Sequence, residues 1–325
     1  MFDFRQIDWD EACREEARRL TRLAIQEDLG RAYDWTTLAL VPPDTPGRAE
    51  VVVRKPGVVA GLVAAAEVLG EFDPKIVWKP LRHDGDAVSA DTIAARISGP
   101  ARSLLAAERT MLNFLGRLSG IATLTRQYVD AVARTGARIY DTRKTTPGWR
   151  RLEKYAVRRG GGCNHRLSLC EAILIKDNHL AMAAQLVDEA ASFFPHNNKA
   201  GSLVNGIGNA VQRARAFLAE MNAGPGPSPL ELGEILIEIE VDSLAQFEVA
   251  LAAEPDLIML DNFSLADLRK AVELRNRRGS RIELEASGGV SLDTLRAIAE
   301  TGVERISAGA LTHSAPWLDL ALDWS

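Results

Sequence analysis

The sequence predicts an α/β protein in which an α+β segment, ending near residue 118, precedes a βα barrel. The main observation is a series of six short aliphatic runs separated by helical patterns, because near-continuous apolar strands indicate a parallel sheet covered on both faces. In addition, every run ends in polar residues or glycine. The 325 residues, 46% of them hydrophobic, are enough for two such domains.

The first half begins with an amphipathic pattern over residues 10–29, which predicts a helix. Residues 47–62 predict strands around the turn KPG, and a helix, a strand and a hairpin signal over residues 83–99 follow. A long helical pattern from about Ala101 to Arg134 carries Arg109 and closes this half.

The six aliphatic runs are the predicted barrel strands: 138–144, 172–179, 234–241, 256–263, 281–289 and 304–310. In βα barrels the active site lies at the carboxyl ends of the strands. The sequence therefore predicts one mouth formed by the strand-end residues Arg143, Lys144, Lys176, Glu240, Asp261, Ser287 and Gly309.

One interval between strand ends is unusually long. Lys176 and Glu240 are 64 residues apart, whereas the other intervals are 21 to 33 residues, so an insertion is predicted at about 193–233. Its NGIGNAV (205–211) lacks the third glycine of a dinucleotide-binding loop and follows no predicted strand, which excludes that interpretation.

Positive charge is concentrated in one stretch of an acidic chain. The formal net charge is −5, yet residues 138–166 contain nine Lys or Arg against two acids, giving +7 there and −12 elsewhere. This favours a small anionic ligand in a local cleft. A nucleic-acid-binding protein, using Tyr140, Trp149 and Tyr155 among these cations, is the alternative, and the acidic total argues against it.

The chain shows no targeting or membrane signal. Its N-terminus is acidic and then amphipathic, and no segment has the roughly 18 uncharged apolar residues of a membrane span. Three cysteines, Cys13, Cys163 and Cys170, form no C-x-x-C pair and leave one unpaired, so a reducing cytoplasm is expected.

Glycine-rich loops follow the last two predicted strands. ASGGVSLDTL (286–295) begins a helix with Ser291 as its expected N-cap. SAGALTHS (307–314) is a second glycine-containing loop after the next strand. Backbone N–H groups in such loops approach phosphate oxygens, so we expect phosphate binding here, with tight turns as the alternative.

Two carboxylates end consecutive strands. Glu240 and Asp261 offer hard oxygen ligands suited to Mg²⁺, although salt bridges to nearby lysines explain them equally well. Glu238 would face the barrel interior and is the other candidate ligand.

Five residues form the candidate anion site, with no cysteine nucleophile or Ser-His-Asp arrangement beside them: Arg143, Lys144, His165, Arg166 and Lys176. Arginine matches carboxylates bidentately and lysine acts as a point charge, so the set suits several carboxylates or a pyrophosphate. The other cations of this stretch are expected on a solvated face: Arg150, Arg151, Lys154, Arg158 and Arg159.

At this point the stretch DTRKTTPGWRRLEKYAVRRGGGCNHR, with LIKDNH after it, resembles the quinolinate phosphoribosyltransferases, or carboxylating nicotinate-nucleotide pyrophosphorylases. The resemblance extends to ERTMLNFLGRLSGIAT, IEVDSLAQF, LDNFS, EASGGVS and SAGALTHS. It implies an N-terminal α/β sandwich domain (1–118), on which residues 311–325 pack back, and an incomplete barrel of six or seven strands (119–310).

The resemblance also implies roles for individual residues. Quinolinate binding falls on Arg143, Lys144, His165, Arg166 and Lys176, with Arg109 entering from the partner subunit of a homodimer. Pyrophosphate and Mg²⁺ fall on Glu240 and Asp261, phosphate binding falls on Ser287, Gly288 and Gly309, and the catalytic set is Lys144, Lys176, Glu240 and Asp261.

The implied reaction joins quinolinate to phosphoribosyl pyrophosphate, releasing pyrophosphate and CO₂ and forming nicotinate mononucleotide for NAD biosynthesis. A phosphoribosyltransferase for another anionic ring, or a molybdenum-associated paralogue of the same fold, would share the phosphate loops and differ in the cations. Substrate screening separates these alternatives.

Overall fold

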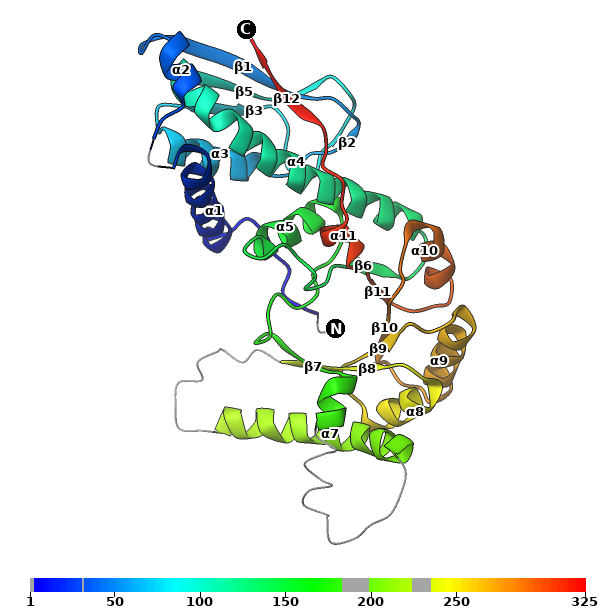
Figure 1. Ribbon diagram of the computed structural model, residues 1–325. Helices are drawn as coiled ribbons and strands as arrows, with labels where there is room; N and C mark the ends of the chain where they lie inside the picture. The colour runs from blue at the N-terminus through cyan, green and yellow to red at the C-terminus, as the bar shows by residue number, and fades with distance from the viewer. Residues whose placement is uncertain (1–2, 31, 183–198, 224–234) are drawn as a thin grey trace. The chain divides into compact units, whose positions relative to one another are not determined.

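The computed structural model describes residues 3–30, 32–182, 199–223 and 235–325. The chain divides into two compact units, each formed by several stretches of sequence. The parallel-sheet unit comprises residues 1–5, 131–140 and 165–308, and the antiparallel-sheet unit comprises residues 6–130, 141–164 and 309–325. Figure 1 labels most helices and strands of both units.

All six predicted barrel strands are present, and they form one parallel sheet. They are β6 (Arg138–Tyr140), β7 (Ala172–Ile175), β8 (Leu236–Val241), β9 (Leu257–Asp261), β10 (Glu283–Ser287) and β11 (Arg305–Ser307). The order is β6-β11-β10-β9-β8-β7. This is the circular order of a barrel opened between its first two strands, so the incomplete barrel is confirmed.

Helices α8 (Leu244–Ala253), α9 (Leu265–Arg277) and α10 (Leu292–Ala299) connect consecutive strands of this sheet. Serines begin them: the Ser264 side chain accepts from Asp267 N–H, and Ser291 forms a capping box with Thr294, as expected for an N-cap at Ser291. Interior β8 and β9 are almost entirely buried, which explains their aliphatic sequences.

The long interval between β7 and β8 contains helix α7 (Lys199–Ala223), which contacts α8 and both strands. NGIGNAV lies inside this helix, where Ile207 and Val211 are buried, so it forms no nucleotide-binding loop. The rest of the predicted insertion, 193–198 and 224–233, lies outside the described residues.

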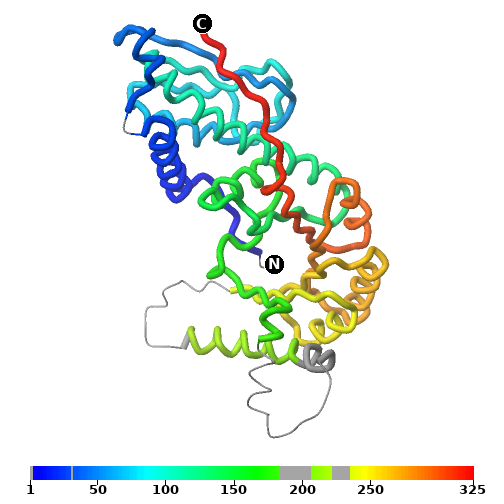
Figure 2. The backbone as a smooth tube through the Cα atoms, in the orientation of Figure 1, coloured from blue at the N-terminus to red at the C-terminus, as the bar shows by residue number. Residues whose placement is uncertain are grey.

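The antiparallel-sheet unit contains a four-stranded sheet of order β12-β1-β5-β3. Its strands are β1 (Pro46–Val53), β3 (Val77–Pro80), β5 (Thr92–Pro100) and β12 (Leu320–Trp324). The C-terminal strand β12 pairs with β1, and Figure 2 shows the chain end running beside the early strands. The predicted hairpin over residues 83–99 is wrong in its pairing, because β4 (Ala87–Val88) pairs with β2 (Gly57–Val58).

Six helices belong to this unit: α1 (Glu11–Leu29), α2 (Trp35–Leu40), α3 (Leu62–Phe72), α4 (Ala101–Ala131), α5 (Arg150–Gly160) and α11 (Ala310–His313). The amphipathic and long helices predicted for residues 10–29 and 101–134 are α1 and α4. Helix α5 is buried on most sides from Leu152 to Val157. None of the helices in the described ranges has the length and apolarity needed to cross a bilayer.

Candidate active site

The parallel-sheet unit places four of the expected site residues at or just beyond the carboxyl ends of its strands. Lys176 follows β7, Glu240 lies near the end of β8, and Asp261 and Ser287 end β9 and β10. Asp261 and Ser287 are register partners on neighbouring strands. The ammonium of Lys176 is paired with the carboxylate of Glu240, so the salt bridge weighed against metal binding is present.

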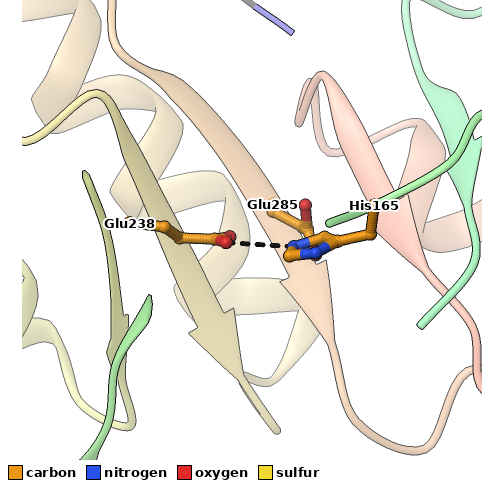
Figure 3. A group of neighbouring side chains, drawn as sticks. All are labelled: His165, Glu238 and Glu285. Atoms are coloured by element: carbon orange, nitrogen blue, oxygen red, sulfur yellow. Dashed lines mark ion pairs between the residues drawn. The ribbon is translucent and has the colours of Figure 1, made fainter. Parts of the chain in front are cut away.

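A buried group lies deeper in the same unit, formed by His165, Glu238 and Glu285 (Figure 3). Nε2 of His165 lies 3.0 Å from Glu238 Oε2 and 3.6 Å from Glu285 Oε1. Both glutamate side chains are completely buried. They project from the strand interiors of β8 and β10, where an acid within an aliphatic run is the signal in the sequence.

The protonation of His165 decides what this group can bind. Nδ1 of His165 accepts the backbone N–H of Arg166 at 2.9 Å, and a neutral imidazole that accepts at Nδ1 carries its proton on Nε2. A proton on Nε2 occupies the lone pair that a metal ion would need, and this nitrogen lies at ion-pair distance from Glu238. In this tautomer the three side chains lie at ion-pair distance and Nε2 is not available to a metal ion, so a role for His165 in anion binding stays a prediction.

Burial controls the charge on the two glutamates. Removal from water raises the pKa of Glu238 to about 7, against a smaller opposing effect of Arg305. Burial likewise raises the pKa of Glu285 to about 7, and the neighbouring charge of Glu238 adds to the increase. Of the two candidate Mg²⁺ ligands on β8, the Glu238 side chain is completely buried, whereas the Glu240 side chain is partly exposed to solvent.

The loop after β10 passes close to the residue that follows β9. Gly288 has φ +88°, and a Cβ there would lie 2.2 Å from Oδ1 of Asn262. Asn262 N–H also donates to the carbonyl of Ser287 at 2.9 Å, and its side-chain amide donates to Asp261 at 2.8 Å. The loop is thereby tied to the end of β9.

The antiparallel-sheet unit holds the other expected site residues, Arg109, Arg143, Lys144 and Gly309. A cleft of about 1030 Å³ between α1, α4 and the loop after Asp141 is lined by Arg109, Lys144 and the aromatic rings of Phe114, Trp149 and Trp317, among others. Arg109 and Lys144 thus face one cleft of a single chain.

Three cations of this unit have no acidic partner. Arg109, Arg143 and Lys144 form no ion pair with any residue in the described ranges, and Nε of Arg143 is buried without a hydrogen-bond acceptor there. In contrast, Arg117 is paired with Glu153, and Lys154 is paired with Asp141. Arg109 and Lys144 are exposed and Arg143 is partly exposed, so all three cations remain accessible to an anionic ligand.

One expectation about the basic stretch is wrong. Lys154 is completely buried rather than solvated, because Asp141 neutralises its ammonium inside the unit. Arg150, Arg151, Arg158 and Arg159 are only partly exposed. Local sequence pattern could not locate the buried partner of Lys154, which lies 13 residues earlier.

The chain is similar to known proteins over nearly its whole length. It matches the N-terminal domain of quinolinate phosphoribosyl transferase over residues 34–119, and the C-terminal domain over residues 121–203 and 226–323. A "Nicotinate-nucleotide pyrophosphorylase [carboxylating]" of Mycobacterium leprae (strain TN) is 42% identical over 313 residues, covering 95% of this chain and 97% of that protein. A "Probable nicotinate-nucleotide pyrophosphorylase [carboxylating]" of Synechocystis is 41% identical, covering 92% and 89%.

Solved structures agree with the sequence comparison. The nicotinate-nucleotide pyrophosphorylase of Francisella tularensis superposes with a TM-score of 0.82 at 33% identity, covering 99% of this chain and 100% of that one. The corresponding protein of Ehrlichia chaffeensis gives a TM-score of 0.78 at 34% identity, covering 94% and 98%. Matches to both domains and over nearly the whole length show that the chain belongs to the quinolinate phosphoribosyl transferase family.

Proposed function

We infer that this chain transfers the phosphoribosyl group of phosphoribosyl pyrophosphate to quinolinate, releasing pyrophosphate and CO₂ and forming nicotinate mononucleotide, a step of NAD biosynthesis. The observation that carries this proposal is the match to both family domains together with full-length relatives named for this reaction. The protein is accordingly a pentosyltransferase.

The unpaired cations support the choice of an acidic ring as substrate. Quinolinate carries two carboxylates, and Arg143 and Lys144 of the antiparallel-sheet unit have no competing acid in the described chain. In the other unit Arg166 is buried and directly follows His165, so its guanidinium is the proposed carboxylate ligand there. His165, with both ring nitrogens directed at protein atoms, is assigned a supporting role in the quinolinate site.

The reaction needs no protein nucleophile. The pyridine nitrogen attacks ribose C1 while pyrophosphate leaves, so the protein aligns two polyanions and stabilises negative charge on the leaving group. Lys144 and Lys176 are the proposed lysines for that charge. The pyridinium ring then accepts the electrons of the C–CO₂ bond as CO₂ departs, and a proton takes its place. Arginines favour this step by keeping the carboxylate ionised.

We propose Mg²⁺ as the cofactor, held by Glu240 and Asp261. The donor set fits, since both residues offer hard oxygen ligands at the ends of neighbouring strands and Mg²⁺ commonly uses one or two protein carboxylates with phosphate oxygens. When bound, the ion supplies charge stabilisation to the pyrophosphate group. The Lys176 ammonium is paired with Glu240 and offsets its negative charge. Ser287, Gly288 and Gly309 are the proposed phosphate-loop residues.

The proposed assembly is a homodimer with shared sites, in which Arg109 of one chain binds substrate in the site of the other chain. The alternative is that Arg109 binds substrate in its own chain, because Arg109 and Lys144 line one cleft there. A reducing cytoplasmic location is proposed because all three cysteines are free thiols.

The experiment is an incubation of the purified protein with quinolinate, phosphoribosyl pyrophosphate and Mg²⁺, with separation of nucleotides by chromatography. Nicotinate mononucleotide should accumulate, and omission of either organic substrate should abolish it. A folded protein that forms no nicotinate mononucleotide under these conditions would overturn the proposal.

A further inference from the structure

The loop of residues 141–149, which carries Arg143 and Lys144, is held by two consecutive buried residues of α5. Glu153 and Lys154 are both completely buried, although charged side chains are rarely buried in folded proteins. Lys154 pairs with Asp141 at the beginning of the loop, and Glu153 accepts a hydrogen bond from Thr146 in its middle. The loop is thus fixed from inside the antiparallel-sheet unit.

Lys154 fixes the beginning of the loop. Its ammonium is paired with the buried carboxylate of Asp141. Nδ2 of Asn164, also completely buried, donates to Asp141 Oδ2 at 2.6 Å and to the Lys154 carbonyl at 2.9 Å. The backbone N–H of Asp141 donates to the carbonyl of Cys163 at 3.1 Å. Both side-chain oxygens and the backbone of Asp141 therefore have defined partners, two residues before Arg143.

Glu153 fixes the middle of the loop. Its Oε2 accepts the backbone N–H of Thr146 at 3.2 Å, while its Oε1 accepts from the Arg117 guanidinium at 2.7 Å. The hydroxyl of Thr312 donates to the carbonyl of Lys144 at 2.8 Å. The backbone on both sides of the two unpaired cations is consequently held by hydrogen bonds.

Such a network is poorly explained by stability alone. Replacing a buried ion pair by apolar residues of similar volume is often neutral or stabilising, whereas charged hydrogen bonds in a buried network specify a single arrangement. Arg143 and Lys144 need a defined arrangement, because they have no protein anion to orient them in the described chain.

We propose that Glu153 and Lys154 are positioning residues, which act through Thr146 and Asp141 to orient Arg143 and Lys144 toward the anionic substrate. This rests on the proposed function, in which those two cations bind quinolinate. Neither positioning residue is expected to touch the substrate.

The test uses the double variant Asp141→Asn/Lys154→Met, which removes both charges and leaves no unpaired charge in the interior. Quinolinate binding is measured by isothermal titration calorimetry, and folding by circular dichroism and thermal melting. We expect a native spectrum with quinolinate Kd raised about tenfold or more, since small displacements of positioned groups can cost about 10²-fold in efficiency.

A double-mutant cycle with Arg143→Ala separates positioning from general damage. In the Arg143→Ala background the double replacement should raise Kd by a clearly smaller factor, about threefold or less, because one of the two oriented cations is already absent. The control is Arg275→Met, which removes a buried cation paired with Glu304 at 2.8 Å in the other unit. It should lower the melting temperature and leave quinolinate Kd unchanged.

Equal factors in both backgrounds, or an unchanged Kd in a folded double variant, would overturn the proposal. Should the double variant not fold, Glu153→Leu replaces it, because leucine removes the acceptor for the Thr146 N–H while Arg117 keeps the carbonyls of Thr312 and Ala315 as acceptors. An unchanged Kd in that variant would equally overturn the proposal. Wild-type protein that does not bind quinolinate would instead contradict the proposed function.

Discussion

Replacing Glu285 by glutamine should change how the stability of the protein depends on pH. Burial raises the pKa of this carboxyl from its ordinary value of 4.5 to about 7. A carboxyl with a raised folded-state pKa binds its proton more tightly in the folded than in the unfolded state. The contribution of this carboxyl to the free energy of unfolding is therefore fully present below about pH 4.5 and is lost as the pH rises through about 7.

The magnitude follows from the same values. An increase of the pKa from 4.5 to about 7 corresponds to about 3 kcal/mol of unfolding free energy lost between pH 4.5 and pH 8. Glutamine has nearly the same shape and cannot ionise. The free energy of unfolding of Glu285→Gln, taken relative to that of wild type, should therefore increase by up to about 3 kcal/mol from pH 5 to pH 8. This increase is expected whatever the difference between the two proteins is at pH 5.

The assay is urea denaturation followed by tryptophan fluorescence at pH 5, 6, 7 and 8, with Glu300→Gln as the control for loss of an exposed carboxylate. The stability difference between Glu285→Gln and wild type should rise across this range, and the difference for the control should stay level. A constant difference for Glu285→Gln would refute the account of the buried cluster.

Three further predictions concern the site. Arg166→Ala should lower kcat/KM for quinolinate by roughly 10²-fold, the scale for losing a charge-assisted contact in a buried site, and near-wild-type kinetics would show that the pocket is misplaced. Glu240→Ala and Asp261→Ala should need more Mg²⁺ while still binding quinolinate in calorimetry; the reverse pattern would reassign both residues. Arg109→Ala and Lys144→Ala homodimers should each be nearly inactive, yet mixing should restore roughly a quarter of wild-type activity through heterodimers with one intact site. No recovery, with subunit exchange confirmed, would place Arg109 in the site of its own chain.

Much of the fold could be predicted because the strands of a covered parallel sheet are aliphatic throughout. LIEIEV and LIMLD indicate β8 and β9 without any tertiary information. Strand lengths were less predictable, since β6 ends at Tyr140 and the polar residues after it form a loop. The pairing of β4 with β2 depends on contacts distant in sequence, which a local hairpin signal does not contain.

The site was predictable as a set of residues and not as a set of contacts. Strand-end position marks Lys176, Glu240 and Asp261, because it depends only on where each aliphatic run stops. The burial of Lys154 depends on Asp141, 13 residues earlier, and the surroundings of His165 depend on strands more than 70 residues later. A charged residue on a helix has the same local pattern whether a buried partner or water neutralises it.

The proposed reaction is best tested with quinolinate and nicotinate as separate acceptors, with phosphoribosyl pyrophosphate and Mg²⁺ present in both reactions, while nicotinate mononucleotide and CO₂ are measured together. Quinolinate should yield the two products in equal amounts, because each transfer is followed by one decarboxylation, and nicotinate should yield almost no nucleotide. Equal turnover of the two acids, or nucleotide formed without CO₂ from quinolinate, would contradict the claim.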